Sequence, residues 1–298
     1  MADSMQNDLA VVIVTWNVKE AVLVNLRSVF ASSPMPDIEV VVVDNASKDG
    51  TAEAVREAFP QVQVIANTEN LGFSKACNQG IHASTARHIL LLNPDMRVEP
   101  DSLSKTVAYL DQSPEVGVLG AKLIDSHGHP IHHMRRFPTI KDQVALLLKL
   151  PHLFPDLIHR YHARDLDLAA EQDVDSVRGS YFAMNRSAIS KVGILDERFY
   201  IWFEEVDYCK RVKKAGLAVR YVPSIVAHDL VGRSFAQRAF FWKQKMFIQS
   251  LIRYFEKWHP TWEVWLLYAI RPPVLGVAIV GDILFRLFPS LGKKTSRV

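Results

Sequence analysis

The first third of the chain alternates short apolar runs with stretches of helical spacing. Each apolar run is rich in β-branched and aliphatic residues, which favours a buried strand. The four runs cover residues 9–15, 38–43, 62–66 and 89–92. The stretches with helical spacing cover residues 19–30, 51–59 and 74–83. This alternation predicts an α/β fold with a mostly parallel central sheet, flanked by helices and joined by right-handed crossovers.

Polar side chains follow each of the four predicted strands. Thr15 and Asn17 follow the first, Asp44 the second, Asn70 the third and Asp95 the fourth. Open α/β sheets bind ligands at the carboxyl ends of their strands, so this pattern predicts a nucleotide site there. Asp44 has the chemistry to accept a hydrogen bond from a base or a ribose, and it equally fits a turn or a helix cap.

The fourth predicted strand ends in the triplet Asn93-Pro94-Asp95. A carboxylate on a proline-stiffened turn suits a divalent cation that bridges phosphate oxygens. The same three residue types are common in plain turns, so the triplet alone fits either interpretation.

Composition narrows the classes of function. The chain has 35 basic and 32 acidic residues, and its net charge of +3 gives no indication of nucleic-acid binding. It contains neither a G-x-G-x-x-G nor a G-x-x-x-x-G-K-[ST] motif, which argues against a dehydrogenase and a P-loop NTPase. Its two cysteines, Cys77 and Cys209, lie far apart and predict free thiols in a reducing compartment.

The second half of the chain holds a strand pattern at residues 175–184 that Gly179 interrupts. A glycine inside a strand either allows close approach of a ligand or marks a β-bulge. Further on, Glu204, Glu205 and Asp207 follow a run of aromatic residues. Apolar neighbours raise the pKa of a carboxyl group and suit it to general-base work. An acidic first turn of a helix over 204–215 would explain the same cluster.

The ordered motifs together resemble family 2 glycosyltransferases, and within them the rhamnosyltransferase-like group. The motifs are VIVTWN (12–17), VDNASKDGT (43–51), NLGF (70–73) and LNPD (92–95). The resemblance spans roughly residues 9–235. It implies a GT-A fold and a nucleotide-diphosphate sugar donor.

Carried onto this chain, the resemblance implies a donor site. The residues placed there are Thr15, Asn17, Asp44, Gly72, Phe73, Asn78, Asn93 and Arg233. Asp95 matches the metal-binding D-x-D position, and His228 would contact the metal or the diphosphate. Mg²⁺ or Mn²⁺ is therefore the implied cofactor. Asn93 replaces the first acid of the motif, and a neutral ligand weakens cation binding.

The resemblance also implies the catalytic side of the site. Residues 203–207, FEEVD, are similar to the family's F-x-E-D-x-D segment, whose second paired acid is the base in inverting members. That similarity makes Glu205, which stands where an Asp is usual, the base, with Glu204 in reserve. The acceptor-binding residues it implies are Arg178, Gly179, Trp202 and Asp207.

Histidines and arginines cluster between residues 127 and 136. They are His127, His129, His132, His133, Arg135 and Arg136. No cysteine or acid frames them at the spacing of a structural zinc site. A mobile basic loop near the donor diphosphate or the acceptor is the preferred interpretation.

From residue 240 onward the composition shifts to aromatic, apolar and basic residues. The apolar run at 274–281 is far shorter than the ~20 residues that span a bilayer. Tryptophans and basic flanks instead predict a helix lying in the membrane interface, with a helical cap on the core or a dimer contact as alternatives. Residues 143–154 are a second candidate lipid-facing or acceptor-side helix. The expected domains are therefore a GT-A domain at 1–239, with halves at 9–97 and 98–239, and a helical segment at 240–298.

These features together predict an inverting glycosyltransferase of cell-surface polysaccharide synthesis. The preferred donor is dTDP-rhamnose, and the expected acceptor is a saccharide or a polyprenyl-diphosphate-linked saccharide. Peripheral contact with the cytoplasmic face of the membrane is expected and nucleic acid is not; the sequence does not define an oligomeric state. A nucleotidyltransferase is one alternative, although residues 15–20 lack the Gly/Lys/Arg-rich loop it would need. A non-catalytic sugar- or lipid-binding scaffold is the other, because Asn93 replaces a metal acid.

Overall fold

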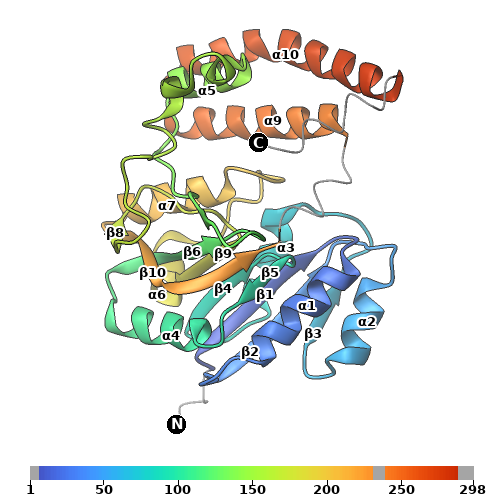
Figure 1. The fold of residues 1–298 in the computed structure, drawn as a ribbon, viewed down its shortest axis with the longest axis vertical. Coiled ribbons are helices and arrows are strands. Elements are labelled where there is room, and N and C mark those ends of the chain that lie inside the picture. Colours follow the sequence, from blue (N-terminus) through green and yellow to red (C-terminus); the bar gives the residue numbers. More distant parts are fainter. Residues whose placement is uncertain (1–6, 231–238, 288–298) are drawn as a thin grey trace.

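The computed structural model describes residues 7–230 and 239–287, and its centre is one large mixed sheet (Figure 1). The strand order is β3-β2-β1-β4-β9-β6-β10-β5, with β7 paired to β6 and β8 paired to β10. The strands are β1 Leu9–Thr15, β2 Ile38–Asp44, β3 Gln63–Ala66, β4 His88–Leu92, β5 Met96–Val98, β6 Val116–Ile124, β7 Pro130–Ile131, β8 Gln172–Asp173, β9 Tyr181–Asn185 and β10 Ala218–Asp229.

The first half of the sheet is parallel, as the alternating pattern predicts. β1 pairs with both β2 and β4, and β2 pairs with β3, all in the parallel sense. The register places Thr15 opposite Asp44, so the polar residues that follow these strands meet at one edge. Their buried aliphatic side chains explain why these strands read as continuous apolar runs.

The second half of the sheet mixes both directions. β9 runs antiparallel between β4 and β6, whereas β6 and β10 are parallel. The strand pattern at 175–184 forms a strand only from Tyr181, so Arg178 and Gly179 lie on the preceding loop. Gly120 in β6 accommodates that segment, because a Cβ there would lie 2.7 Å from Val177.

Helices cover both faces of the sheet. One hydrophobic core joins the sheet to α1, α2 and α4, and a second core on the other face joins it to α3, α6 and α7. The helices of this part are α1 Lys19–Phe30, α2 Thr51–Ala58, α3 Phe73–His82, α4 Ser102–Gln112, α5 Ile140–Leu147, α6 Arg186–Val192 and α7 Glu204–Lys214, with 3₁₀ turns η1 Leu150–His152 and η2 Pro155–Ile158. Both cysteines are free and buried in the second core.

Two long helices, α9 Phe240–Trp258 and α10 Thr261–Leu287, complete the described chain. Side chains of α9 such as Leu251 and Phe255 share a third hydrophobic core with Phe203 and Val206 near the start of α7. Figure 1 shows α10 stacked on α9 at the end of the molecule farthest from the α1–α2 side, with α5 beside it. The C-terminal helices are therefore packed onto the sheet domain through α9.

The apolar stretch of α10 is longer than the sequence pattern indicates. The helix continues through Pro272 and Pro273, so the short run at 274–281 is only its second half. The resulting 24-residue stretch Thr261–Leu284 is long and apolar enough to cross a membrane by length and composition, and 17% of its most apolar window is buried in the fold. The expectation of an apolar segment far too short to span is thus corrected, because two prolines did not end the helix.

Candidate active site

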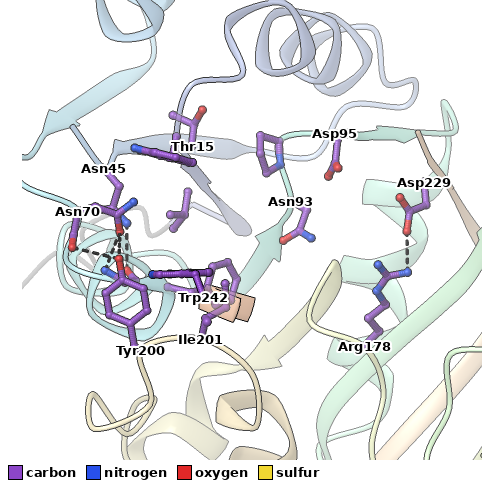
Figure 2. Close-up of a pocket in the computed structure, with 15 residues that line it drawn as sticks. Thr15, Asn45, Asn70, Asn93, Asp95, Arg178, Tyr200, Ile201, Asp229 and Trp242 are labelled. Carbon is purple, nitrogen blue, oxygen red and sulfur yellow. Dashed lines mark hydrogen bonds and ion pairs between the residues drawn. The ribbon is translucent and has the colours of Figure 1, made fainter. Parts of the chain in front are cut away.

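A cleft opens at the carboxyl ends of β1 and β4, where the parallel part of the sheet meets its mixed part (Figure 2). Its lining residues are Val14, Thr15, Trp16, Asn45, Asn70, Gly72, Phe73, Asn93, Pro94, Asp95, Arg178, Tyr200, Ile201, Asp229 and Trp242. The structure thus brings the sequence-predicted residues Thr15, Gly72, Phe73, Asn93 and Asp95 into one cleft.

A buried side chain of α1 holds the turn that carries Asn93 and Asp95. Asn25 Nδ2 donates hydrogen bonds to the carbonyl oxygens of Asn93 and Met96, both at 2.9 Å. The Asn93 N–H donates to the Ser180 carbonyl at 3.0 Å. These bonds fix the backbone of the turn, and the side chains of Asn93 and Asp95 both line the cleft.

The oxygen atoms of Asn93 and Asp95 fit a divalent cation of the Mg²⁺ type. Such cations prefer oxygen ligands and often bind through one or two carboxylates, with substrate phosphates and water supplying the rest. Among residues 7–230 and 239–287, no three His, Cys, Asp or Glu side chains group closely enough to hold a metal ion. The donor set therefore suits a cation that arrives with a phosphate-bearing substrate.

Tyr200 and Asn70 form one end of the cleft. The Tyr200 hydroxyl donates to Asn70 Oδ1 at 2.8 Å, and the Tyr200 carbonyl accepts from the Phe73 N–H at 2.6 Å. Only glycine fits at position 72, because its φ is +86° and a Cβ there would lie 2.6 Å from the Tyr200 carbonyl oxygen. Trp242 of α9 packs edge-on against the Tyr200 ring, with centroids 6.1 Å apart, and adds a wall from the C-terminal helices.

An ion pair forms the opposite end of the cleft (Figure 2). Arg178 Nη1 donates to Asp229 Oδ2 at 2.8 Å; the Asp229 side chain is 3% exposed and that of Arg178 is 46% exposed. Side chains alternate along a strand, so Asp229 faces the cleft while His228 faces the other side and pairs with Glu99. His228 therefore lies outside the lining of the cleft, and β10 contributes Asp229 to that lining.

A second pocket adjoins the cleft behind Arg178 and Gly179. Its lining residues are Ile131, His132, His133, Arg135, Tyr161, Ser176, Val177, Arg178, Trp202, Phe203, Glu205, Val206 and Phe247. A Cβ on Gly179 would lie 3.8 Å from the Cβ of Glu205 and 4.0 Å from Cε1 of Phe73. Gly179 therefore stands between Glu205 and the wall of the cleft.

Glu205 carries the chemistry of the second pocket. Its Oε2 is buried and has no hydrogen-bond partner among the residues that the structure describes. Burial raises the pKa of the Glu205 carboxyl group, while backbone N–H groups and the charge of Arg178 act in the opposite direction. A carboxylate that is desolvated in this way is a stronger base at neutral pH than an exposed one.

Glu204 is directed elsewhere. It is buried on α7, and burial together with the charge of Glu205 raises its pKa well above the ordinary value. Its charge acts on Cys77 in the core between α3 and α7, and it is absent from the lining of both pockets. Of the paired acids, Glu205 is the one that faces a pocket.

The turn that leads into α7 has an unusual backbone conformation. Trp202 and Phe203 have φ values of +65° and +69°, in the left-handed region that bulky residues avoid. Phe247 of α9 contacts both rings, with centroids 6.0 Å from Trp202 and 5.4 Å from Phe203, and Tyr254 packs on Phe203 at 5.6 Å. Aromatic packing from α9 thus holds the turn that positions Glu205.

The comparison with protein families decides the class of this site. The model of glycosyl transferase family 2 matches residues 10–193, which is more than half of the chain. The chain belongs to glycosyl transferase family 2.

Two curated relatives of this glycosyltransferase carry rhamnosyltransferase names. An N-acetylglucosaminyl-diphospho-decaprenol L-rhamnosyltransferase of Mycobacterium tuberculosis (strain ATCC 25618 / H37Rv) is 29% identical over 233 residues, covering 74% of this chain and 75% of the relative. The dTDP-rhamnosyl transferase RfbF of Shigella flexneri is 24% identical over 234 residues, covering 76% of this chain and 71% of the relative.

Solved structures place the glycosyltransferase in the GT-A fold. A mannosyltransferase of Pyrobaculum calidifontis in complex with GDP-Man and Mn²⁺ superposes with a TM-score of 0.58 and 19% identity. The match covers 93% of this chain and 75% of the mannosyltransferase. The predicted fold class is confirmed, with the parallel order restricted to the first half of the sheet.

Three predicted donor residues of the glycosyltransferase lie outside the cleft lining. Asn78 Nδ2 donates to the Leu195 carbonyl at 2.9 Å and to Glu197, and its Oδ1 accepts from the Leu195 N–H at 3.1 Å. These bonds tie α3 to the loop between α6 and α7, and Asn78 lies outside the lining of the cleft in which it was predicted. Asp44 accepts from the N–H and hydroxyl of Ser47, and Asn17 Oδ1 accepts from the Lys48 N–H at 2.7 Å. Both residues hydrogen-bond to the loop between β2 and α2, which contains Ser47 and Lys48.

Asp207 is a structural residue of the glycosyltransferase. Its fully buried carboxylate accepts from Trp258 Nε1 at 2.8 Å and pairs with Lys257 at 2.7 Å and Arg211 at 2.9 Å. Trp258 and Lys257 end α9, so this network fastens α9 to α7. The prediction of an acceptor contact is corrected, because no oxygen of Asp207 faces either pocket.

Within the basic segment 127–136, His133 and Arg135 are hydrogen-bonded to neighbouring segments. His133 is buried, its Nε2 lies 2.8 Å from the Ala121 carbonyl, and its Nδ1 accepts from the Arg178 N–H at 3.4 Å. Burial lowers the pKa of His133 to about 3, so the ring is neutral. Backbone bonds between Arg135 and Ser176 at 3.1 Å fix the same segment to the loop of Arg178. Arg233 lies outside the described residues.

Several cleft residues escape sequence reasoning. They are Trp16, Asn45, Tyr200, Ile201, Asp229 and Trp242. Asn70 was expected as the polar residue that follows the third strand, and Asn45 stands inside a recognised motif and could have been selected in the same way. Asp229 follows His228 and could have been found from strand alternation. Trp242 belongs to a distant helix, and its pattern gives no indication of the cleft.

Proposed function

We propose that this glycosyltransferase is an inverting rhamnosyltransferase. It transfers rhamnose from dTDP-rhamnose to a saccharide carried on a polyprenyl diphosphate, as a step of cell-surface polysaccharide synthesis. The donor occupies the cleft of Asn93 and Asp95, and the acceptor occupies the pocket of Glu205. The rhamnosyltransferase names of two relatives support the choice of sugar and acceptor.

The observation that carries the proposal is the position of Glu205. Its desolvated carboxylate lines a pocket that shares Arg178 with the donor cleft, and Gly179 lies between Glu205 and Phe73 of the cleft wall. In a single displacement, Glu205 accepts the proton of an acceptor hydroxyl while that oxygen bonds to the anomeric carbon. The bond from the anomeric carbon to the diphosphate oxygen breaks, and the nucleoside diphosphate leaves with the electron pair. The configuration at the anomeric carbon is inverted.

Asn93 and Asp95 would hold a Mg²⁺ or Mn²⁺ ion at the donor diphosphate. Bound there, the ion would neutralise the negative charge of the leaving group. The mannosyltransferase that shares the fold was solved with GDP-Man and Mn²⁺, which supports a cation in this position. Asp229 holds Arg178 at the same end of the cleft, where its guanidinium can contact phosphate oxygens.

Exposed apolar side chains support a membrane-linked acceptor. Leu153 and Phe154 on the η1–η2 segment are 74% and 58% exposed, and Trp265 and Val277 on α10 are 69% and 72% exposed. α5, which leads into η1, contacts α10 at the same end of the molecule (Figure 1). We propose that this end rests on the cytoplasmic face of the membrane that carries the acceptor.

Product analysis tests the function. Purified protein is incubated with Mg²⁺, a panel of nucleotide sugars and a polyprenyl-diphosphate-linked N-acetylglucosamine, and the product is isolated. We expect transfer from dTDP-rhamnose alone, loss of transfer with a chelator, and an anomeric configuration opposite to that of the donor by NMR. Retention of configuration would overturn the role of Glu205, and transfer of another sugar would overturn the donor assignment.

A second test addresses the cation at the donor diphosphate. Asp95→Asn is expected to lower transfer at least about 100-fold and to weaken Mn²⁺-dependent dTDP binding. Glu204→Gln serves as the matched control, because Glu204 faces the core and lines neither pocket. Release of pyrophosphate from a nucleoside triphosphate by the wild type would instead indicate a nucleotidyltransferase.

A further inference from the structure

The second pocket contains the positively charged side chain of Arg135, which forms no ion pair with an acidic side chain of the described residues. Arg135 lines the pocket, and its Nη1 donates to the carbonyl oxygens of His132 at 2.9 Å and Met134 at 2.7 Å. No ion pair within residues 7–230 and 239–287 includes this guanidinium. Burial, reinforced by the like charges of Arg164 and Arg178, lowers its pKa. A largely desolvated charge of this kind is costly unless an anion reaches it.

His132 stands beside Arg135 in the same pocket. Both ring nitrogens are buried, and neither makes a well-formed hydrogen bond within residues 7–230 and 239–287, although the carbonyl groups of Ala163 and Leu166 lie close enough to act on the ring. Burial and the charges of Arg135 and Arg164 lower its pKa, so the ring is neutral without a ligand. A neutral imidazole still offers one N–H donor, and an arriving anion would favour its protonated form.

The backbone around these two residues is rigid. Arg135 and Ser176 exchange backbone hydrogen bonds at 3.1 Å, and the Ser176 hydroxyl donates to the Arg135 carbonyl at 3.1 Å. His133 carries the Arg178 N–H on its Nδ1. The segment that carries His132 and Arg135 is therefore held in place before any ligand binds, which lowers the entropic cost of binding.

The other residues that line the pocket indicate what kind of molecule carries the anionic group. Glu205 lines the same pocket and awaits a hydroxyl, while Trp202 and Phe247 form an aromatic wall with ring centroids 6.0 Å apart. A ligand that satisfies all three features carries a hydroxyl, an apolar face and a phosphate. Arg135 is not among the residues that line the donor cleft, so the donor's own diphosphate is not that phosphate.

We propose that Arg135 and His132 form an anion subsite that binds the phosphate groups of a diphosphate-linked acceptor. This inference rests on the proposed function, since it places the acceptor sugar between the subsite and Glu205. It also gives a specificity rule. The enzyme selects diphosphate-linked saccharides over neutral glycosides through contacts made on the acceptor side.

Binding of inorganic pyrophosphate tests the subsite without turnover. Titration calorimetry is carried out with EDTA present, so that no cation recruits pyrophosphate to the acids of the donor cleft. We expect Arg135→Gln to weaken binding at least about tenfold, the size of one charge-assisted hydrogen bond. Arg136→Gln is the matched control, because Arg136 pairs with Asp165 and does not line the pocket. Equal binding by wild type and Arg135→Gln would overturn the subsite.

His132→Phe provides an independent test in case Arg135→Gln fails to fold. Replacing His132 removes only weak contacts with the carbonyl groups of Ala163 and Leu166, so the variant should stay close to the wild-type melting temperature and still lose pyrophosphate affinity. Kinetics then compare a diphosphate-linked acceptor with a neutral alkyl glycoside of the same sugar. Arg135→Gln is expected to raise KM for the former about tenfold or more and to leave the KM of the donor unchanged.

The outcomes separate this inference from the proposed function. Arg135-dependent pyrophosphate binding without transfer to any acceptor would keep the subsite and overturn the rhamnosyltransferase assignment. Transfer that Arg135→Gln slows equally for both acceptors would keep the function and overturn the subsite.

Discussion

Arg178 reaches from the loop before β9 to Asp229 at the end of β10, and the 2.8 Å ion pair between them stands where the donor cleft and the Glu205 pocket meet. One guanidinium thereby contributes to the environment of both proposed substrates. Its charge lowers the pKa of Glu205, which burial raises. Arg178 thus has a role in setting the strength of the base.

Replacing Arg178 should change the pH dependence of transfer. Arg178→Gln removes a charge that favours ionised Glu205, so the pKa of the base rises and the acid limb of the pH–rate profile moves to higher pH. The measurement is kcat/KM against pH for wild type and variant. Arg136→Gln, which alters an arginine outside both pockets, should leave the limb in place. A limb that moves to lower pH would contradict this account.

Glu205→Gln should lower the rate of transfer and raise the stability of the fold at neutral pH. Removal of the base is expected to lower kcat by about 10²–10⁴. The folded-state pKa of Glu205 is raised, so the native state binds more protons than the unfolded state, and stability falls as pH rises from the unfolded pKa through the folded one. Glutamine lacks this penalty, and the melting temperature at neutral pH should therefore rise. Calorimetry at acidic and neutral pH measures it; a lower melting temperature at neutral pH would contradict the desolvation of Glu205.

Gly179→Ala tests the space between base and donor. The φ of Gly179 lies outside the left-handed region, and the new methyl would make ordinary contacts with Glu205 and Phe73. The fold should therefore tolerate the change, while transfer falls about 10- to 100-fold because the reacting groups are displaced. Gly276→Ala in α10, where nothing lies within 4 Å, is the matched control and should keep full activity. Unchanged kcat/KM in Gly179→Ala would place the reaction elsewhere.

Asn25→Leu should weaken the attachment of the turn at residues 93–96 to α1. The substitution removes both 2.9 Å bonds to the turn and is expected to cost about 1–3 kcal/mol of stability. Mn²⁺ affinity in the presence of dTDP should fall as well, because Asn93 and Asp95 lose their support. Asn185→Ala, which removes a helix cap of α6, should cost stability without altering Mn²⁺ affinity. The same Mn²⁺ affinity in Asn25→Leu and wild type would refute this role.

Asp207→Asn should loosen the C-terminal helices. It breaks a buried network with Arg211, Lys257 and Trp258, and the loss of one partner of such a network is expected to cost about 3–5 kcal/mol. Denaturant unfolding and limited proteolysis measure the effect, with early cleavage expected within α9. A chain that ends at residue 239 should likewise lack a stable Glu205 pocket. Full stability of Asp207→Asn would contradict the anchoring role.

The strands and the first three helices are predictable because their determinants are local. A buried parallel strand such as β1 needs a run of aliphatic residues, and α1 has the expected bounds. The polar groups that follow these strands must converge wherever the strands are parallel and in register. For that reason Thr15, Asn93 and Asp95 were placed in one cleft from sequence alone.

Side-chain direction and distant contacts account for what the sequence could not provide. A one-residue step along β10 decides whether His228 or Asp229 faces the cleft, and the motif does not encode that step. Asn78 and Asp207 match family positions, yet they bond to Leu195, Glu197 and Trp258, which lie 51 to 119 residues away. Trp242 reaches the cleft only because α9 docks on α7.

The left-handed turn at Trp202 and Phe203 has a consequence for biosynthesis. Its aromatic supports, Phe247 and Tyr254, are translated more than 40 residues after the turn itself. Chains fold progressively from the N-terminus as they leave the ribosome. The donor half can therefore form while the turn before Glu205 still lacks its aromatic support, and the Glu205 pocket is completed only after α9 has been synthesised. A truncated or stalled chain would bind nucleotide sugar without consuming it.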